Sequence, residues 1–284
     1  MGNMEIVSYY PKGFCDGVAN AFDLATKALK EYPNEVLYLV GSLVHNELAI
    51  SSLLCKGCVI LDERDGDLLT QMESLPDGAV VLYSAHGHDK DSYDRIAEKK
   101  HFIVYDASCK HILSNIKKMK EAKGQVAFVC DPKHLEAKAV SSLDNVTVID
   151  PKNQVISKYD YVISQTSLDE EAYLKVVDEL KKANPDIVSL GGRCPSTVLR
   201  QRNIVEAPND IDLFVIVGSK DSSNTKRLAY LAKKYHQNAD VIQVLDADEL
   251  RGFNLNKYKK AALASGASSS QTAYIDIENY LKSL

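Results

Sequence analysis

The sequence predicts an α/β protein made of three small parallel-sheet domains, and three observations support this fold class. Short apolar runs alternate with amphipathic segments along the whole chain, as in parallel sheets whose strands are connected by helices. A polar motif follows nine of these runs, where a strand is expected to end and a helix to begin. The order of the motifs repeats three times, and each repeat opens with a cysteine: Cys15, Cys109 or Cys194.

The first repeat, residues 14–108, has a predicted helix after Cys15 and two strands that lead into polar motifs. Apolar residues at helical spacing predict the helix: Val18, Ala21, Phe22, Ala25 and Leu29. The run at residues 36–40 precedes Val44-His45-Asn46, and the run at residues 79–82 precedes Ser84-Ala85-His86-Gly87. Residues 1–13 contain one more apolar run, and we expect this strand to complete the sheet of the third repeat.

The second repeat, residues 109–193, follows the same order. The run at residues 102–105 leads to Cys109, and a helical face follows it: Ile112, Leu113, Ile116 and Met119. The run at residues 126–129 precedes His134 and Glu136, and the run at residues 161–163 precedes Thr166.

The third repeat, residues 194–284, repeats the order once more. The run at residues 187–190 leads to Cys194, and the following Pro195 suits a first helical position. The runs at residues 213–217 and 261–264 precede Ser222 and Ser268. Further short runs occupy matching places in all three repeats, at residues 59–61, 146–149 and 241–244. Because ligands bind at the carboxyl edge of parallel sheets, we expect the three edges to face a common centre in a pseudo-threefold arrangement.

Composition excludes several classes of protein. The net charge of −5 argues against a nucleic-acid binder or a polybasic membrane surface. No apolar stretch approaches the roughly 20 residues that span a bilayer. The chain start lacks the pattern of a signal peptide, so we expect a cytoplasmic protein whose six cysteines are reduced thiols or metal ligands.

The three repeat cysteines predict a metal centre with an open coordination position. Each lies at an expected helix start, where free N–H groups and the helix dipole favour a thiolate. Their separations of 94 and 85 residues indicate a centre between domains, because structural zinc sites usually draw cysteines in close pairs. Both zinc and an iron–sulfur cluster fit three thiolates. We expect structural roles for the other cysteines: Cys55, Cys58 and Cys130.

The polar motifs predict a binding site for a multiply charged anion. They offer many neutral hydrogen-bond donors and little permanent positive charge, and the set is His45, His86, His134, Thr166, Ser222, Ser223, Asn224 and Ser268. Glu136 is the only carboxylate within these motifs. A carboxylate beside an anion should have a raised pKa, which suits a proton donor.

Taken together, the motifs resemble those of the 4-hydroxy-3-methylbut-2-enyl diphosphate reductases, the LytB type. The resemblance follows the chain in order and is carried by residues 13–18, 44–46, 84–87, 106–109, 165–167, 217–224 and 266–268. It implies three α/β domains around a [4Fe–4S] cluster that has three protein ligands and one open iron. The implied reaction is the last step of the methylerythritol phosphate route, which gives isopentenyl and dimethylallyl diphosphate.

The resemblance also implies roles for individual residues. Cys15, Cys109 and Cys194 would ligate the cluster, and Glu136 with Thr166 and His134 would deliver protons to the substrate hydroxyl. The small allylic diphosphate would be held by His45, His86, His134, Ser222, Ser223, Asn224 and Ser268. An external donor such as ferredoxin or flavodoxin would supply electrons, because no nucleotide-binding glycine fingerprint is evident.

Two alternatives remain open at this point. Three segments that flank the ligand motifs depart from the family pattern: Lys110-His111, residues 130–139 and Pro195-Ser196-Thr197. A divergent iron–sulfur paralogue acting on another small anionic substrate is therefore the second hypothesis. The third is a metal or redox sensor that uses Cys55 and Cys58, but a sensor needs no anion pocket.

Overall fold

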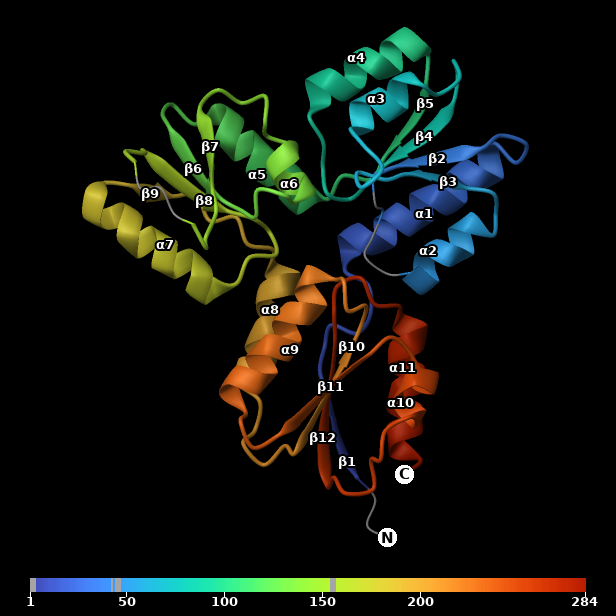
Figure 1. Cartoon of the computed structure of the whole chain (residues 1–284), viewed down its shortest axis with the longest axis vertical. Coiled ribbons are helices and arrows are strands. Elements are labelled where there is room, and N and C mark those ends of the chain that lie inside the picture. The colour runs from blue at the N-terminus through green and yellow to red at the C-terminus, as the bar shows by residue number, and fades with distance from the viewer. Residues whose placement is uncertain (1–3, 42, 44–46, 154–156) are drawn as a thin grey trace. The chain divides into compact units, whose positions relative to one another are not determined.

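The computed structural model describes residues 4–41, 43, 47–153 and 157–284. The chain forms two compact units. Unit 1 comprises the described residues of Met1–Asp16, His45–Ile50 and Pro195–Leu284, and unit 2 those of Gly17–Val44 and Ser51–Cys194. Unit 1 holds one four-stranded sheet and unit 2 holds two, and every strand pairing among the described residues is parallel (Figure 1).

The first sheet of unit 2 has the strand order β3-β2-β4-β5. Its strands are β2 (Leu37–Val40), β3 (Val59–Leu61), β4 (Val80–Tyr83) and β5 (Ile103–Asp106). The helices in this part of the chain are α1 (Asp16–Glu31), α2 (Glu47–Leu54), α3 (Leu68–Glu73) and α4 (Lys90–Lys100). All four residues of β4 are buried, which explains why its sequence is a continuous apolar run rather than an alternating one.

The second sheet of unit 2 has the order β7-β6-β8-β9. Its strands are β6 (Val126–Val129), β7 (Val146–Ile149), β8 (Tyr161–Ser164) and β9 (Val188–Ser189). Its helices are α5 (Lys110–Glu121), α6 (Leu135–Lys138) and α7 (Glu170–Ala183). Successive residues of β6 enter different cores: Ala127 packs with Val176 of α7, and Phe128 packs with Met119 of α5.

The sheet of unit 1 has the order β1-β12-β10-β11. Its strands are β1 (Glu5–Ser8), β10 (Leu213–Val217), β11 (Asp240–Val244) and β12 (Lys260–Ser265), so the first strand of the chain pairs with the last. Its helices are α8 (Pro195–Val205), α9 (Ser223–Tyr235), α10 (Ala247–Arg251) and α11 (Gln271–Lys282).

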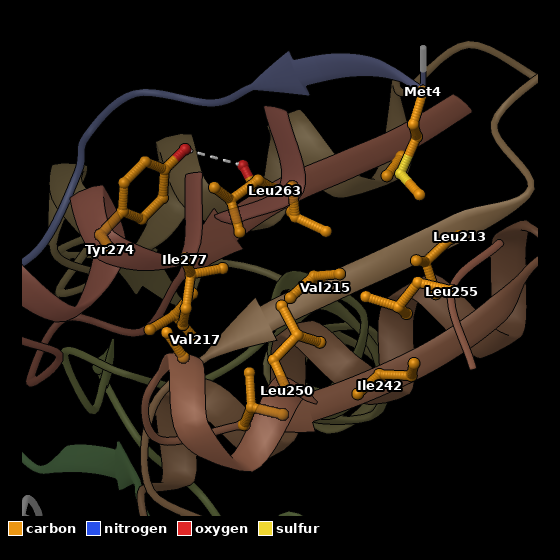
Figure 2. Close-up of a cluster of buried hydrophobic side chains, with 14 residues drawn as sticks. Met4, Leu213, Val215, Val217, Ile242, Leu250, Leu255, Leu263, Tyr274 and Ile277 are labelled. Carbon is orange, nitrogen blue, oxygen red and sulfur yellow. Dashed lines mark hydrogen bonds between the residues drawn. The ribbon is translucent and has the colours of Figure 1, made fainter. Parts of the chain in front are cut away.

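The central strand β10 of unit 1 is buried on both faces. Val215 and Val217 pack with Leu250 of α10 and Ile277 of α11, and Figure 2 shows this cluster. The residues between them, Phe214 and Ile216, belong to a second cluster, which includes Ile204 of α8 and Leu228 of α9. The two clusters place one helix pair on each face of the sheet, which is the layering of doubly wound α/β folds.

The α/β class predicted from the sequence is confirmed. Eight of the nine polar motifs lie where a described strand ends and the next helix begins, and α8 begins at Pro195 as expected. Residues 44–46, one of the nine motifs, lie outside the described residues. The short helices α3 and α10 were not predicted. The predicted repeat boundaries and the threefold arrangement stay predictions. In the part of the chain described above, no helix combines the length and apolarity required to cross a bilayer.

Candidate functional site

The backbone N–H of each repeat cysteine donates a hydrogen bond to a carbonyl group of another polar motif. In unit 1, the Cys15 N–H donates to the Ala267 carbonyl at 2.9 Å, just before α1. In unit 2, the Cys109 N–H donates to the Ala85 carbonyl at 3.0 Å, and the Cys194 N–H to the Thr166 carbonyl at 2.9 Å. In all three cases the acceptor belongs to the last polar motif of a repeat. The sequence pattern gave no sign of this link.

The three thiols share the same exposure and the same position relative to a helix. Cys15, Cys109 and Cys194 form no disulfide among the described residues, have intermediate exposure, and each directly precedes a helix. Gly17 lies against one of them, because a Cβ on Gly17 would meet Cys109 Sγ at 2.9 Å. Within the described residues, no three His, Cys, Asp or Glu side chains gather as ready ligands of one ion, so the predicted convergence of the thiols stays a prediction.

The remaining cysteines occupy the positions expected for structural residues. Cys55 and Cys58 lie between the end of α2 and the start of β3, the first exposed and the second buried. Cys130 lies at the end of β6 and is fully buried. Burial raises the pKa of the Cys130 thiol far above its ordinary value, so this sulfur stays protonated and unreactive.

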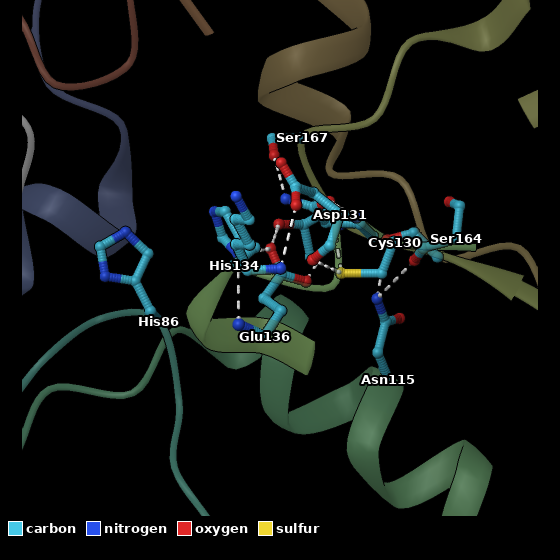
Figure 3. Close-up of polar contacts among 12 residues, drawn as sticks. His86, Asn115, Cys130, Asp131, His134, Glu136, Ser164 and Ser167 are labelled. Carbon is cyan, nitrogen blue, oxygen red and sulfur yellow. Dashed lines mark hydrogen bonds and ion pairs between the residues drawn. The ribbon is translucent and has the colours of Figure 1, made fainter. Parts of the chain in front are cut away.

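Glu136 is a buried carboxyl that one threonine holds at both oxygens. Its side chain is 3% exposed, and it lies on the short helix α6 (Figure 3). Thr166 donates from its backbone N–H to Glu136 Oε2 at 3.0 Å and from Oγ1 to Oε1 at 2.5 Å. Desolvation outweighs these two hydrogen bonds and raises the pKa of Glu136 to about 7, as expected for a proton donor.

His134 lies beside this carboxyl in a defined tautomer. It is the N-cap of α6, and its Nδ1 accepts the Glu136 backbone N–H at 3.1 Å. Because Nδ1 is an acceptor, the neutral ring carries its proton on Nε2. Nδ1 lies 4.0 Å from Glu136 Oε1, and the ring meets that of His86 edge to face at 5.6 Å (Figure 3). Unit 2 therefore brings together four predicted site residues: His86, His134, Glu136 and Thr166.

Gln165 was absent from the predicted set of site residues. Its side chain fixes the loop after β6, which leads to His134. Its Oε1 accepts from the Asp131 N–H at 3.1 Å and from Cys130 Sγ at 3.3 Å, and its Nε2 donates to Ser167 Oγ at 2.9 Å. These bonds connect the loop after β6, which leads to His134, with the loop after β8, which carries Thr166. The sequence signal for this role was the position of Gln165 in the motif at residues 165–167, next to Thr166.

The start of α9 in unit 1 presents a second polar group. Ser222 is the N-cap of α9, and its Oγ accepts the Thr225 N–H at 3.4 Å and the Ser268 hydroxyl at 3.3 Å. Asn224 is 8% exposed, yet its side-chain oxygen and nitrogen have no hydrogen-bond partner among the described residues. Ser223 is exposed. Because buried amides are almost always satisfied, Asn224 is suited to a ligand that completes its hydrogen bonds.

His45, the remaining member of the predicted set, lies outside the described residues. The other members occur in two groups. His86, His134 and Thr166, with the acid Glu136, belong to unit 2, and Ser222, Ser223, Asn224 and Ser268 belong to unit 1. Each group consists of neutral hydrogen-bond donors at the ends of buried parallel strands, the position at which α/β proteins bind their ligands.

The α/β scaffold, with a cysteine directly before a helix in each repeat and a buried acid on α6, can now be compared with known families. The model of the LytB protein family matches residues 6–282. The chain belongs to the LytB protein family.

Curated relatives carry one common name. Proteins of Clostridium tetani and Clostridium perfringens, both called 4-hydroxy-3-methylbut-2-enyl diphosphate reductase, are 28% and 29% identical to the chain over 93% and 96% of its length. The match covers 96% of the C. perfringens protein. The chain spans only 41% of the C. tetani protein and 34% of a relative of the same name from Fusobacterium nucleatum.

Solved structures share the fold. The E-1-hydroxy-2-methyl-but-2-enyl-4-diphosphate reductase from Plasmodium falciparum is 25% identical and matches with a TM-score of 0.83, over 98% of this chain and 88% of that one. A structure of (E)-4-hydroxy-3-methyl-but-2-enyl diphosphate reductase is 23% identical, with a TM-score of 0.69 over 99% of this chain and 100% of that one. The second likeness concerns the fold alone.

Proposed function

We propose that this protein is an iron–sulfur oxidoreductase that reductively removes the hydroxyl group of 4-hydroxy-3-methylbut-2-enyl diphosphate. The products would be isopentenyl and dimethylallyl diphosphate. The observation that carries the proposal is the pairing of Glu136 with Thr166, which keeps a buried carboxyl at the carboxyl edge of a sheet. Its pKa, raised to about 7, keeps the proton on a large share of the molecules at neutral pH, whereas an ordinary glutamate would be ionised, so that the carboxyl can give a proton to a leaving hydroxyl.

The residues that would hold the cofactor suit a [4Fe–4S] cluster with one open iron. Cys15, Cys109 and Cys194 are thiols outside any disulfide in the described part of the chain, and each precedes a helix whose N-terminal dipole favours a thiolate. Thiolates are the usual ligands of iron–sulfur clusters, and three of them leave one iron without a protein ligand. When bound, the cluster would supply electrons and a Lewis-acidic iron to the substrate oxygen.

Proton delivery falls to Glu136 and its neighbours. Glu136 would protonate the hydroxyl so that it leaves as water, and Thr166 would then stabilise the carboxylate through its two hydrogen bonds. His134 presents its Nε2–H as a donor, because its Nδ1 is already occupied by the Glu136 N–H. After water has left and two electrons have been taken up from the external donor, the allylic fragment would gain a second proton at either end of its double-bond system, which would account for two products.

Neutral donors would bind the diphosphate. His86 and His134 from unit 2, together with His45, would act as imidazole donors. Ser222, Ser223, Asn224 and Ser268 would donate from hydroxyl and amide groups, supported by the N–H groups at the start of α9. The unpartnered amide of Asn224 supports this role, because a phosphate oxygen would satisfy its nitrogen.

The electrons would come from a separate donor protein such as ferredoxin or flavodoxin. The substrate and this donor are the partners that we propose, and a cytoplasmic location stays a prediction.

The test starts from anaerobic purification with iron and sulfide quantification, followed by turnover of the proposed substrate with reduced methyl viologen. We expect the iron and sulfide of one [4Fe–4S] cluster per chain and turnover that Glu136→Gln abolishes. A full cluster without turnover would favour a divergent paralogue that acts on another small anion, which the altered loop at residues 130–133 would explain. Zinc, or no metal after reconstitution, would overturn both.

A further inference from the structure

We infer that Arg200 is a positioning residue for the Cys15 thiol: its buried guanidinium fixes the backbone of the segment that leads from β1 to Cys15. This inference rests on the proposed function only in so far as Cys15 is a cluster ligand. All the contacts that carry it lie within unit 1.

Arg200 is buried in an environment of backbone carbonyl groups. It lies on α8 and is 3% exposed. Its Nη1 donates to the Pro11 carbonyl at 2.9 Å, and its Nη2 donates to the Gly13 carbonyl at 2.7 Å. Nη1 also lies 2.7 Å from the carbonyl and 2.9 Å from the hydroxyl of Ser265, at the end of β12. A guanidinium cannot lose its proton in a protein, so these acceptors must offset the cost of burying a full charge.

Side chains hold the neighbouring carbonyls of the same segment. Asn203, one turn further along α8, donates from Nδ2 to the Tyr10 carbonyl at 2.6 Å. The Tyr274 hydroxyl from α11 shares its proton between the Leu263 carbonyl at 2.9 Å and the Tyr9 carbonyl at 3.2 Å. Four of the five carbonyls at residues 9–13 therefore accept hydrogen bonds from side chains of two helices.

Gly13 completes this arrangement at the point closest to Cys15. Its φ of 76° lies in the left-handed region, and a Cβ at this position would meet the Gln271 backbone at 2.7 Å. Its N–H donates to Ser265 Oγ at 3.1 Å, the same hydroxyl that lies against Arg200. Arg200 and Ser265 together set the direction in which the chain enters Cys15, whose own N–H is bound by Ala267.

The fork of Arg200 is the central part of this network, because it binds carbonyls on both sides of residue 12 and a third on β12. Lysine would retain the charge but could not reach these acceptors in the fixed planar geometry of a guanidinium. Loss of Arg200 would therefore leave unit 1 folded around its apolar clusters and free the Cys15 loop. A purely structural arginine would loosen the whole unit instead.

The experiment measures the alkylation rate of each cysteine in the metal-free protein with iodoacetamide, resolved by peptide mass spectrometry. In Arg200→Met we expect Cys15 to react at least about fivefold faster than in the wild type, and Cys109 to react at the wild-type rate. Asn203→Ala, which removes one contact and no charge, should give a smaller increase at Cys15. Arg202→Met is the matched control, because Arg202 is an exposed neighbour that pairs with Glu206 at 2.8 Å on the surface of α8.

Hydrogen exchange of the β10 amides separates local from general loosening of unit 1. In Asn203→Ala, the exchange rate of the β10 amides should equal that of the wild type. In Arg200→Met, the fold-increase in this exchange rate should be smaller than the fold-increase in the alkylation rate of Cys15. Addition of ethylguanidinium to Arg200→Ala should slow Cys15 alkylation again, whereas the same addition to the Arg202 control should have no effect. An unchanged Cys15 rate, or a rise that only parallels β10 exchange, would overturn the inference.

The outcome is distinguishable from failure of the proposed function. If the wild type binds no cluster but Cys15 responds as described, Arg200 positions the thiol and the proposed function fails. If the wild type is an active iron–sulfur reductase and the alkylation rate of Cys15 is the same in the wild type and in Arg200→Met, the proposed function stands and this inference fails. In cluster-loaded protein, Arg200→Lys should also alter the electron paramagnetic resonance signal of the reduced cluster, which Arg202→Met should leave unchanged.

Discussion

Thr166 donates twice to Glu136, and its carbonyl oxygen accepts the N–H of Cys194. One residue thus connects the buried acid with the loop of a proposed cluster ligand, through three hydrogen bonds that lie within unit 2. The hydroxyl bond, at 2.5 Å, is the shortest of the three. Two of them stabilise the ionised form of Glu136, so Thr166 sets how readily this acid gives up its proton.

The pH dependence of turnover should report this acid. Because Glu136 must be protonated to act, kcat/KM should fall as the pH rises through about 7. Thr166→Val removes the hydroxyl bond that lowers the Glu136 pKa, so it should move this limb to higher pH. Glu136→Gln should lower turnover by roughly 10²–10⁴-fold and abolish the limb. A limb that Glu136→Gln retains would assign the proton donor to another residue.

Stability should depend on pH through the same carboxyl. Its pKa is raised by folding from 4.5 to about 7, so between these values only the folded state retains the proton. The stability contributed by this carboxyl should therefore be fully present below about pH 4.5, fall as the pH rises through this window by about 1.4 kcal/mol per pH unit, and be lost above it. Relative to wild type, Glu136→Gln should gain on the order of 3 kcal/mol between pH 4.5 and 7. Urea unfolding across this range would measure the difference, and parallel curves would contradict the raised pKa.

Substitution of Asn224 should weaken substrate binding with little effect on stability, whereas substitution of a structural asparagine should do the reverse. The Asn224 amide is buried and has no hydrogen-bond partner within residues 4–41, 43, 47–153 and 157–284, so Asn224→Ala should change the free energy of unfolding by less than about 1 kcal/mol and raise KM at least about tenfold. Asn184 is the matched control. Its Oδ1 accepts from the Tyr159 N–H at 3.0 Å, and its Nδ2 donates to the Ser157 carbonyl at 3.0 Å.

Asn184→Ala should therefore cost about 1–3 kcal/mol of stability and leave KM unchanged. Thermal melts and steady-state kinetics on both variants make this comparison. Equal KM values in the wild type and Asn224→Ala would remove Asn224 from the substrate site.

Serine variants of the cysteines should fall into two groups, those that retain less iron than the wild type and those that retain the same amount. Serine in place of Cys15, Cys109 or Cys194 should each lower the iron retained after anaerobic reconstitution, because a hydroxyl is a poor substitute for a thiolate ligand. Cys55→Ser should retain full iron, because this thiol is exposed in a turn. Iron analysis and visible absorption would measure the outcome. Iron loss in Cys55→Ser alone would support the sensor hypothesis instead.

The strand and helix pattern could be predicted because the buried parallel strands leave a direct mark on the sequence. β10 is buried at all five positions, so it appears as a continuous apolar run. The helices α3 and α10 escaped prediction because each is about one turn long and too short for periodicity. Both depend on a side-chain N-cap instead, Asp67 or Asp246.

The candidate site likewise contains residues that could be predicted from the sequence and contacts that could not. Glu136 and His134 lie close together in the sequence, so a local motif revealed them both. Arg200 and Gly13 are 187 residues apart, and no periodicity or spacing connects them. The link from each repeat cysteine to the last motif of a repeat runs through backbone atoms, which every residue possesses. Such contacts are determined by the fold and become visible only in the structure.

Gly17 gives a further test of the thiol sites, in which helix propensity and packing predict opposite effects. Gly17 lies in the first turn of α1, where alanine should favour the helix by up to about 1 kcal/mol. A Cβ there would meet Cys109 Sγ at 2.9 Å and its Cβ at 3.2 Å, closer than such atoms normally approach. Gly17→Ala should therefore keep or raise the melting temperature of the metal-free protein while it displaces the Cys109 sulfur and lowers iron retention.

Gly252→Ala is the control for this substitution. Gly252 follows α10 with an ordinary φ of −70°, and an added Cβ would meet only the Glu249 carbonyl oxygen, at 3.4 Å. This variant should match the wild type in iron content. Because the Cβ added in Gly17→Ala displaces the Cys109 sulfur, the alkylation rate of Cys109 in the metal-free variant should also change. Cys194 should react at its wild-type rate. Full iron retention in Gly17→Ala would show that the Cys109 sulfur, when it binds metal, does not need the position it has against α1.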